Sequence, residues 1–364
     1  MHRATAFIDC AALQHNCRVV RRLIGNDRKI MAMIKADGYG HGLLQSASAL
    51  NEVDAFGVAT VNEAVFLREA GIAQDIVVMG GFTTLEELAL FFQHQLTPVI
   101  HSQLQLELLD KISVDGSIAV WLKIDTGMHR LGFSATAFPE VYARLSKNKK
   151  IQQPVQLMTH LADADNPDRS FTEHQIATFS KLTDGLPGLK SIANSATVLA
   201  YPEVLRDMVR PGIMLYGVSP IMGKLADSFH LQPVMHLKSK LIAINHYKKG
   251  DKIGYGCTWE CPEPMRVGVV AMGYGDGYPR HIENGTPVLI NNVLCPTVGR
   301  VSMDMMTVDL RSLPNAKVGD HVVLWGHGLP VEKIAASAGT IPYELLCQLT
   351  QRVEFFYVDQ DTSP

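Results

Sequence analysis

The chain has 364 residues, more than one hydrophobic core usually supports, so two domains or one large barrel with an appended part are expected. Its composition, 47% apolar and 19% charged, excludes a disordered or fibrous protein. The net charge of -3, with lysines and arginines scattered along the chain, gives no footprint for nucleic acid or an anionic membrane surface, which leaves small molecules as the expected partners.

From residue 29 to residue 216, short β-rich runs alternate with stretches in which apolar residues recur at helical spacing. Eight strands are predicted, at residues 29–35, 55–60, 76–80, 97–101, 118–124, 155–160, 190–194 and 206–209. The alternation is typical of parallel βα units, and eight of them predict a (β/α)8 TIM-type barrel. A doubly wound open sheet is the alternative, but no Gly-x-Gly-x-x-Gly motif follows an early strand.

After about residue 230 the pattern changes to longer runs that alternate apolar and polar residues, with turn residues at the breaks. These runs lie at residues 233–256, 265–278 and 286–310. A helical pair near residues 330–350 precedes a closing strand. We therefore predict a cofactor-binding barrel over residues 1–230 and a mainly antiparallel β domain over residues 231–364, packed together because no low-complexity linker separates them.

The six cysteines include no Cys-x-x-Cys pair and are too few for a disulfide framework in a chain of this length. Cys257 and Cys261 lie close together, but a zinc site would need further ligands. The N-terminal segment lacks the apolar core of a signal peptide, and no later run reaches the roughly 18 uncharged apolar residues of a membrane span. We therefore expect a cytoplasmic protein without a metal centre or a membrane partner.

In a (β/α)8 barrel the catalytic side chains lie at the C-terminal ends of the strands. Polar residues follow five of the eight predicted strands: Lys35, then Lys123, Asp125 and Arg130, then His160, then Asn194 and Ser195, and finally Arg210. A single charged residue at a strand end is usually a solvated cap. Polar residues after five strands of one rim instead indicate a binding site.

The loops after the seventh and eighth strands, where such barrels habitually bind phosphate, contain Ser195 and Gly212. Without a side chain, Gly212 lets backbone N–H groups approach an anion, although it can also be read as part of an ordinary Pro-Gly turn. A phosphorylated ligand opposite Lys35 suggests a Schiff base with pyridoxal phosphate, because a lysine in an apolar wall has a lowered pKa and is nucleophilic near neutral pH. The alternative is a lysine that extends to solvent at the rim.

A set of short motifs, in the same order along the whole chain, resembles those of alanine racemases. The motifs are MIKADGYGHG (33–42), LKIDTGMHRLGF (122–133), THLADAD (159–165), NSAT (194–197), RPGIMLYG (210–217), GYGDGYPR (273–280), VGRVSMDMM (298–306) and PYELL (342–346). Each motif alone is weak, whereas the set is specific. It implies a pyridoxal phosphate-dependent isomerase that interconverts L-alanine and D-alanine and supplies D-alanine for peptidoglycan.

The resemblance implies a role for each matching residue. Lys35 would form the Schiff base with the cofactor and act as one catalytic base, and Tyr274 would be the other. Arg130 and Met303 would bind the substrate, and Lys123 would be carbamylated, as the matching lysine is in many family members. The remaining cofactor-binding residues would be Tyr39, His160, Asn194, Ser195, Arg210, Gly212, Ile213 and Tyr343.

In the family, the residues matching Tyr274 and Met303 reach the active site of the partner subunit, which implies a homodimer with shared sites. Racemisation removes a proton from one face of a planar centre and returns one to the other face, which requires two opposed groups. A tyrosine hydroxyl ionises only near pH 10 in water, so a tyrosine base needs a cationic or hydrogen-bonding neighbour. The resemblance assigns this link to His160.

Several positions carry further expectations. Arg210 would lie at the pyridine nitrogen, where a permanent positive charge opposes ring protonation and favours simple reprotonation of the substrate over transamination. Asp37, where many family members have asparagine, would raise the pKa of Lys35 if it pointed inward, so we expect it to face away or to pair with a cation. His129 is interpreted as structural, and the glycines after Lys35 are expected to fold the loop closely around the cofactor.

Other functions fit parts of this pattern. A broader-specificity amino-acid racemase and a non-catalytic pyridoxal phosphate-binding protein built on the barrel alone are the main alternatives. A related decarboxylase would show a different cysteine-containing motif near the partner site. A metal-dependent aldolase would need a cluster of histidines and carboxylates, of which only His160 is placed on the rim.

Overall fold

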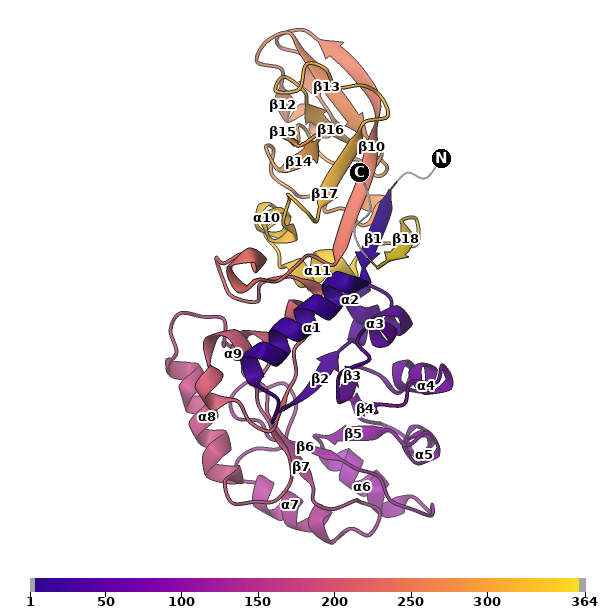
Figure 1. Ribbon diagram of the computed structural model, residues 1–364, viewed down its shortest axis with the longest axis vertical. Helices are drawn as coiled ribbons and strands as arrows, with labels where there is room; N and C mark the ends of the chain where they lie inside the picture. The colour runs from indigo at the N-terminus through magenta and orange to yellow at the C-terminus, as the bar shows by residue number, and fades with distance from the viewer. Residues whose placement is uncertain (1–3, 360–364) are drawn as a thin grey trace.

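The computed structural model describes residues 4–359 as two parts that lie one above the other along the long axis of the molecule (Figure 1). The lower part is a barrel of parallel strands surrounded by helices, and the upper part is a mainly antiparallel sheet. Both ends of the described chain lie in the upper part. The predicted combination of a (β/α)8 barrel and an antiparallel domain is confirmed.

Eight parallel strands form the barrel sheet, in the order β8-β7-β6-β5-β4-β3-β2-β9. They are β2 (Lys29–Met33), β3 (Ala55–Val58), β4 (Asp75–Val78), β5 (Thr97–Ile100), β6 (Trp121–Lys123), β7 (Gln156–Met158), β8 (Lys190–Ser191) and β9 (Met208–Val209). All eight predicted strands are confirmed, each shorter than its predicted run. A 2.8 Å hydrogen bond from the Arg210 N–H to the Ala193 carbonyl joins the two ends of the sheet just beyond β9 and β8.

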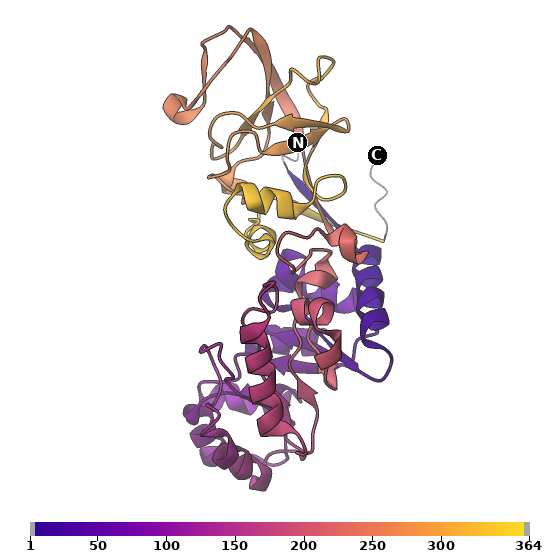
Figure 2. The same cartoon turned by 90° about the vertical axis from the view of Figure 1, so that its left-hand side faces the viewer.

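Helices cover the outside of the barrel (Figures 1 and 2). Sequence-local caps set where several of them begin: Thr60 and Glu63 form a capping box at the start of α4, and Thr84 caps α5. The helices are α1 (Cys10–Ile24), α3 (Leu43–Ala49), α4 (Val61–Glu69), α5 (Leu85–Gln93), α6 (Gln103–Lys111), α7 (Phe138–Lys147), α8 (Ser170–Thr183) and α9 (Ser195–Ala200).

The upper part is organised around one long strand, β10 (Met235–Tyr247), which pairs antiparallel with β1, β13 and β17. The other strands are β11 (Lys252–Ile253), β12 (Trp259–Glu260), β13 (Met265–Val270), β14 (Pro287–Ile290), β15 (Val293–Pro296), β16 (Met306–Asp309), β17 (His321–Trp325) and β18 (Glu354–Val358). The predicted helical pair is present as α10 (Val331–Ser337) and α11 (Pro342–Cys347).

The first strand of the chain, β1 (Thr5–Asp9), lies in the upper sheet and not in the barrel (Figure 1). It pairs antiparallel with β10 and parallel with β18, and the rings of Phe7 and Phe356 stack with their centroids 5.7 Å apart. The strand β1 thus lies between β10 and β18, two strands from the second half of the chain. The division between residues 230 and 231 stays a prediction.

Helix α11 lies at the junction of the two parts, close to the loop that follows β2 (Figure 1).

Within residues 4–359, no helix has the length and apolar character needed to cross a membrane. In the same described range, no three or more His, Cys, Asp or Glu side chains are grouped so that they could hold a metal ion.

Candidate active site

A cavity of about 470 Å³ opens where the barrel strands end, and α11 with its flanking residue Ile341 forms part of its wall. The predicted site residues that line it are Lys35, Tyr39, Lys123, Arg130, His160, Asn194, Ser195, Arg210, Gly212, Ile213 and Tyr343. Tyr274 and Met303 do not line it. The barrel rim and α11 therefore bring together every predicted site residue except these two.

Cations dominate the cavity wall. Lys35, Lys123, Arg130 and Arg210 line it, together with the carboxylate of Asp165. Burial, and then the Arg130 charge, lowers the pKa of Lys35. Burial, and then the Arg210 and Arg130 charges, lowers the pKa of Lys123 to about 8. Both lysines thus hold more neutral amine at neutral pH than a lysine in water does, and the excess of positive charge favours an anionic ligand.

The backbone that follows β2 forms one left-handed helical turn. Residues 36–39 have φ values between 53° and 61°. A residue other than glycine adopts this conformation at a cost of about 1–2 kcal/mol, so the turn needs support from its surroundings. Glu63, on α4, supplies part of it because its Oε1 accepts a 2.9 Å hydrogen bond from the Ala36 N–H. The turn directs Tyr39 back into the cavity wall.

Two glycines of this loop pack against other segments of the chain, while the expectation that the glycines fold the loop closely around the cofactor stays a prediction. A Cβ on Gly40 would lie 2.1 Å from the Leu346 carbonyl oxygen, and one on Gly42 would lie 2.3 Å from the Tyr357 hydroxyl. Both glycines also have positive φ. Their missing side chains let the loop after Lys35 contact β18 and α11, of which α11 lines the cavity.

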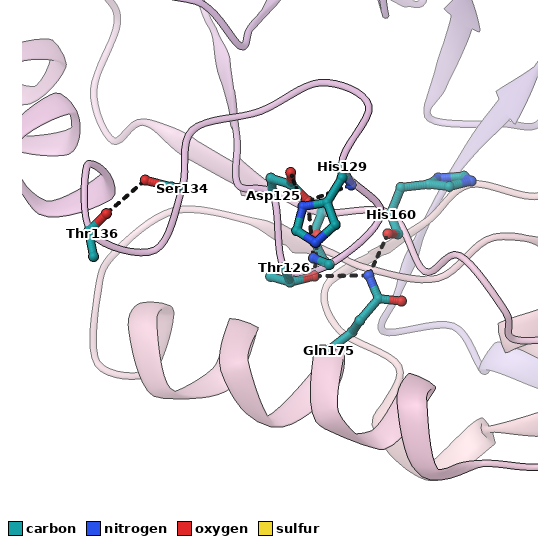
Figure 3. Close-up of polar contacts among 9 residues, drawn as sticks. Asp125, Thr126, His129, Ser134, Thr136, His160 and Gln175 are labelled. Carbon is teal, nitrogen blue, oxygen red and sulfur yellow. Dashed lines mark hydrogen bonds and ion pairs between the residues drawn. The ribbon is translucent and has the colours of Figure 1, made fainter.

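Asp37 and His129 both lie outside the cavity wall. Asp37 is exposed, and its Oδ1 accepts a 2.7 Å hydrogen bond from the Leu43 N–H, which confirms that this carboxylate faces away from Lys35. The His129 imidazole contacts Asp125 at 3.1 Å, as Figure 3 shows, within the loop that leads to the cavity. These contacts agree with the interpretation of His129 as structural.

Hydroxyls and backbone N–H groups converge in one corner of the cavity. Ser195 Oγ accepts a 2.9 Å hydrogen bond from the Gly212 N–H, and a Cβ on Gly212 would lie 2.4 Å from the Tyr39 hydroxyl. The Tyr343 ring lies beside Tyr39, with 6.1 Å between the centroids. Asn194 caps α9 with its side chain and so shapes the same loop. Donors arranged in this way suit a phosphate group.

Arg210 is fixed in the cavity wall, with 4% of the residue exposed. Its Nη1 donates to Ser191 Oγ at 2.5 Å, its Nη2 donates to the Thr159 carbonyl at 2.6 Å, and His160 Nδ1 lies 3.4 Å from Nη2. Burial lowers the pKa of Arg210 to about 10, so the guanidinium stays charged at neutral pH. Burial, and then the Arg210 charge, holds the pKa of His160 well below its usual value, so the imidazole is neutral there.

Tyr274 and Met303 lie side by side in the upper part of the molecule, on two neighbouring loops. The Tyr274 N–H donates to the Ser302 carbonyl at 3.0 Å, and the Gly275 N–H donates to the Met303 carbonyl at 2.8 Å. Both residues are open to solvent, Tyr274 with 38% and Met303 with 53% of its surface exposed. One chain therefore does not bring these two predicted site residues into its own cavity.

Two family models match nearly the whole chain. Residues 8–220 match the N-terminal domain of alanine racemases, and residues 234–357 match their C-terminal domain. This chain belongs to the alanine racemase family. The resemblance of the motifs is confirmed, as is the expected enzyme class, an isomerase. The second match excludes a cofactor-binding protein built on the barrel alone.

Similar proteins support this placement over the full length. The alanine racemase of Coxiella burnetii (strain CbuG_Q212) is 54% identical over 366 residues, which cover 99% of this chain and 100% of the relative. The alanine racemase of Nitrosococcus oceani is 51% identical over 354 residues, which cover 97% of this chain and 99% of the relative. The crystal structure of the biosynthetic alanine racemase from Pseudomonas aeruginosa has a TM-score of 0.95 and 40% identity, covering 98% of this chain and 100% of that one.

Gln175, on α8, is a supporting residue of this racemase that the motifs do not contain. Its Nε2 donates to Thr126 Oγ1 at 3.3 Å and to the His160 carbonyl at 3.2 Å, while the His160 imidazole points away from it (Figure 3). Its Oε1 accepts from the Ala162 N–H at 2.9 Å. Since Gln175 is fully buried, these bonds tie together the loops after β6 and β7. A buried glutamine on a helix carries no sequence signal for such a role.

Proposed function

We propose that this racemase interconverts L-alanine and D-alanine with pyridoxal phosphate, acts in the cytoplasm as a homodimer with shared active sites, and supplies D-alanine for peptidoglycan. The observation that carries the proposal is Lys35. Its amine, with a lowered pKa, lines a cation-rich cavity at the barrel mouth, in a chain whose two halves both match the family. A broader-specificity racemase would use the same groups with a larger substrate pocket.

The cavity residues fit pyridoxal phosphate. A volume of about 470 Å³ lies in the range of small-molecule sites, and Ser195, Tyr39, Tyr343 and the backbone of Gly212 and Ile213 would hold the phosphate. Lys35 would bond covalently to the aldehyde. When bound, the cofactor supplies an electron-withdrawing ring that makes the α-proton of the amino acid acidic.

Within such a complex, Arg130 is the group for the substrate carboxylate, because it lines the cavity beside Lys35 and its charge acts on that amine. The neutral amine of Lys35 can accept a proton at one face of the α-carbon. Arg210, still charged at neutral pH, is held by Ser191 and the Thr159 carbonyl where it would oppose protonation of the pyridine nitrogen.

The second base is the strongest reason to propose a homodimer. Among the described residues that line the cavity, Tyr39 and Tyr343 lie in the phosphate corner, and burial raises the pKa of each hydroxyl, that of Tyr343 to about 12. Neither is suited to accept a proton. Tyr274 and Met303 are exposed together on a loop pair outside the cavity, so a second copy of the chain could place them over this site.

Reduction with borohydride tests the cofactor assignment. The purified protein is expected to be yellow and to lose its colour irreversibly, with the cofactor attached to Lys35 and absent from Lys123, the second lysine of the cavity and thus an internal control. Peptide mass spectrometry locates the label. A colourless protein with full activity would contradict the assignment, and rates on L-alanine, L-serine and L-lysine measured side by side decide between strict and broad specificity.

Carbamylation of Lys123 is proposed on the same grounds. A pKa of about 8 leaves part of the amine neutral and reactive toward carbon dioxide, and a carbamate would place an anion among Arg210, Arg130 and Lys35. Protein equilibrated with ¹³C-bicarbonate is expected to show one carbamate resonance by NMR. The resonance should be missing in Lys123→Arg and retained in Lys150→Arg, a control at a lysine outside the cavity. A signal that survives in Lys123→Arg would place the modification elsewhere.

A further inference from the structure

One arginine bridges the two loops that carry Tyr274 and Met303. Arg352 Nε lies 3.0 Å from Asp276 Oδ1, and its Nη2 donates to Asp304 Oδ1 at 2.6 Å. Asp276 follows Tyr274 by two residues, and Asp304 directly follows Met303. The guanidinium therefore connects the positions next to both exposed side chains.

The Asp276 carboxylate depends on this contact. Asp276 is fully buried, and its Oδ2 accepts a 2.9 Å hydrogen bond from the Gly273 N–H. Its Oδ1 has no aligned hydrogen-bond donor among the described residues, so the Arg352 charge is what compensates it. A buried carboxylate without a cation is strongly unfavourable, and removal of Arg352 would drive the loop to rearrange until water reached Asp276.

The backbone of the Tyr274 loop leaves space for the Arg352 side chain. A Cβ on Gly275 would lie 2.4 Å from Arg352 Nη1, so the guanidinium occupies the space that a side chain would take between Tyr274 and Asp276. Thr350 adds two hydrogen bonds, from its Oγ1 to the Gly275 carbonyl at 3.0 Å and from its N–H to the Asp276 carbonyl at 3.2 Å. Thr350 and Arg352 thus contact this loop at Gly275 and at Asp276.

The same segment follows, along the chain, an element that lines the chain's own cavity. It directly follows α11, from which Tyr343 and Cys347 line the cavity wall. The segment that supports the two exposed loops is therefore joined along the chain to α11, which forms part of the cavity wall of the same chain.

We propose that Arg352 is a positioning residue, which holds the Tyr274 and Met303 loops in the one arrangement that fits the cavity of a partner subunit. This inference rests on the proposed function, in which Tyr274 is the second base. Arg352 itself touches no group of the cavity. A guanidinium suits the task because its planar fork engages two carboxylates at once, whereas a lysine ammonium has no such fork.

Arg311 provides a matched control in the same domain. It also joins a buried carboxylate, Asp309, to an exposed one, Glu263, and its side chain is 41% exposed against 39% for Arg352. It has no contact with either loop among the described residues. Arg311→Gln therefore reproduces the loss of an ion-pair bridge without moving Tyr274 or Met303.

The test compares Arg352→Gln, Arg352→Lys, Arg311→Gln and Tyr274→Phe as purified dimers loaded with pyridoxal phosphate. Arg352→Gln is expected to lower the kcat for racemisation at least tenfold while α-proton exchange in deuterium oxide persists for one enantiomer, since the Lys35 face is intact. The kcat of Arg352→Lys should fall less than that of Arg352→Gln. Arg311→Gln should keep the wild-type rate although its Tm changes about as much as that of Arg352→Gln. Because Arg352→Lys retains a cation, it also serves if the glutamine variant fails to fold.

Three results overturn the inference. Arg352→Gln that racemises as fast as Arg311→Gln would show that the bridge does not position the loops, provided that Tyr274→Phe is impaired. A proportional loss of exchange for both enantiomers would show a general structural role. If Tyr274→Phe itself racemises at the wild-type rate, the two-base function fails, and the inference about Arg352 fails with it.

Discussion

Mixing Lys35→Ala chains with Tyr274→Phe chains, each inactive alone, is expected to restore about one quarter of the wild-type racemase activity. Half of randomly assorted dimers contain one chain of each kind, and in each of these one of the two sites combines Lys35 from one chain with Tyr274 from the other. The reason is structural, because Tyr274 is exposed and absent from the cavity that contains Lys35. Activity is measured by circular dichroism of alanine after unfolding and refolding the mixture.

Two affinity tags allow the mixed dimer to be isolated, where half of the wild-type activity is expected. A mixture of two batches of Lys35→Ala chains, treated in the same way, controls for carry-over of active enzyme. Mixed dimers that form but stay inactive would mean that Tyr274 serves its own chain, and would require the loop pair around Met303 to move to the cavity of the same subunit.

Replacing Arg210 by glutamate is expected to lower racemisation by on the order of 100-fold and to produce pyruvate from alanine. The arginine, held by Ser191 and the Thr159 carbonyl, would place positive charge beside the pyridine nitrogen of the proposed cofactor. A carboxylate at that place would favour protonation of the pyridine nitrogen and make the ring a stronger electron sink. The amino group of alanine could then pass to the cofactor and leave pyruvate, with at most one equivalent formed per loaded site. Lactate dehydrogenase with NADH detects the pyruvate.

Arg210→Lys is the matched control for this side reaction. It retains a positive charge but loses the fork that reaches two acceptors, so we expect slower racemisation without added pyruvate. Equal pyruvate production by both variants would show that the charge of Arg210 does not govern the fate of the substrate.

The barrel could be predicted from sequence because its pattern is local. Each strand is a short apolar run followed by a helix with a cap such as Thr60 or Thr84, and all of these lie close together in the chain. The strand β1 could not be found in this way. Its five residues are stabilised by pairing with β10 and β18, more than two hundred residues away, and a local pattern does not reveal such partners.

The residues of the candidate site also fall into those that the sequence could place and those that it could not. Residues of the motifs, such as Lys35 and Arg210, could be placed on the rim because strand ends predict position. Residues that hold them, such as Gln175 and Glu63, act through contacts with distant loops and have no signature. The close approach of Gly40 to the Leu346 carbonyl has no sequence signal for the same reason, because only the fold brings the two together.

The place of β1 limits how members of this family can exchange their halves. Residues 5–7 lie outside both segments that match the family models, yet they pair with strands of the second one. A chimera that joined the barrel of one racemase to the C-terminal half of another would set this strand between β10 and β18 of a foreign sheet. Inheritance of the C-terminal domain is therefore tied to the first few residues of the chain, and the two halves are not independent modules.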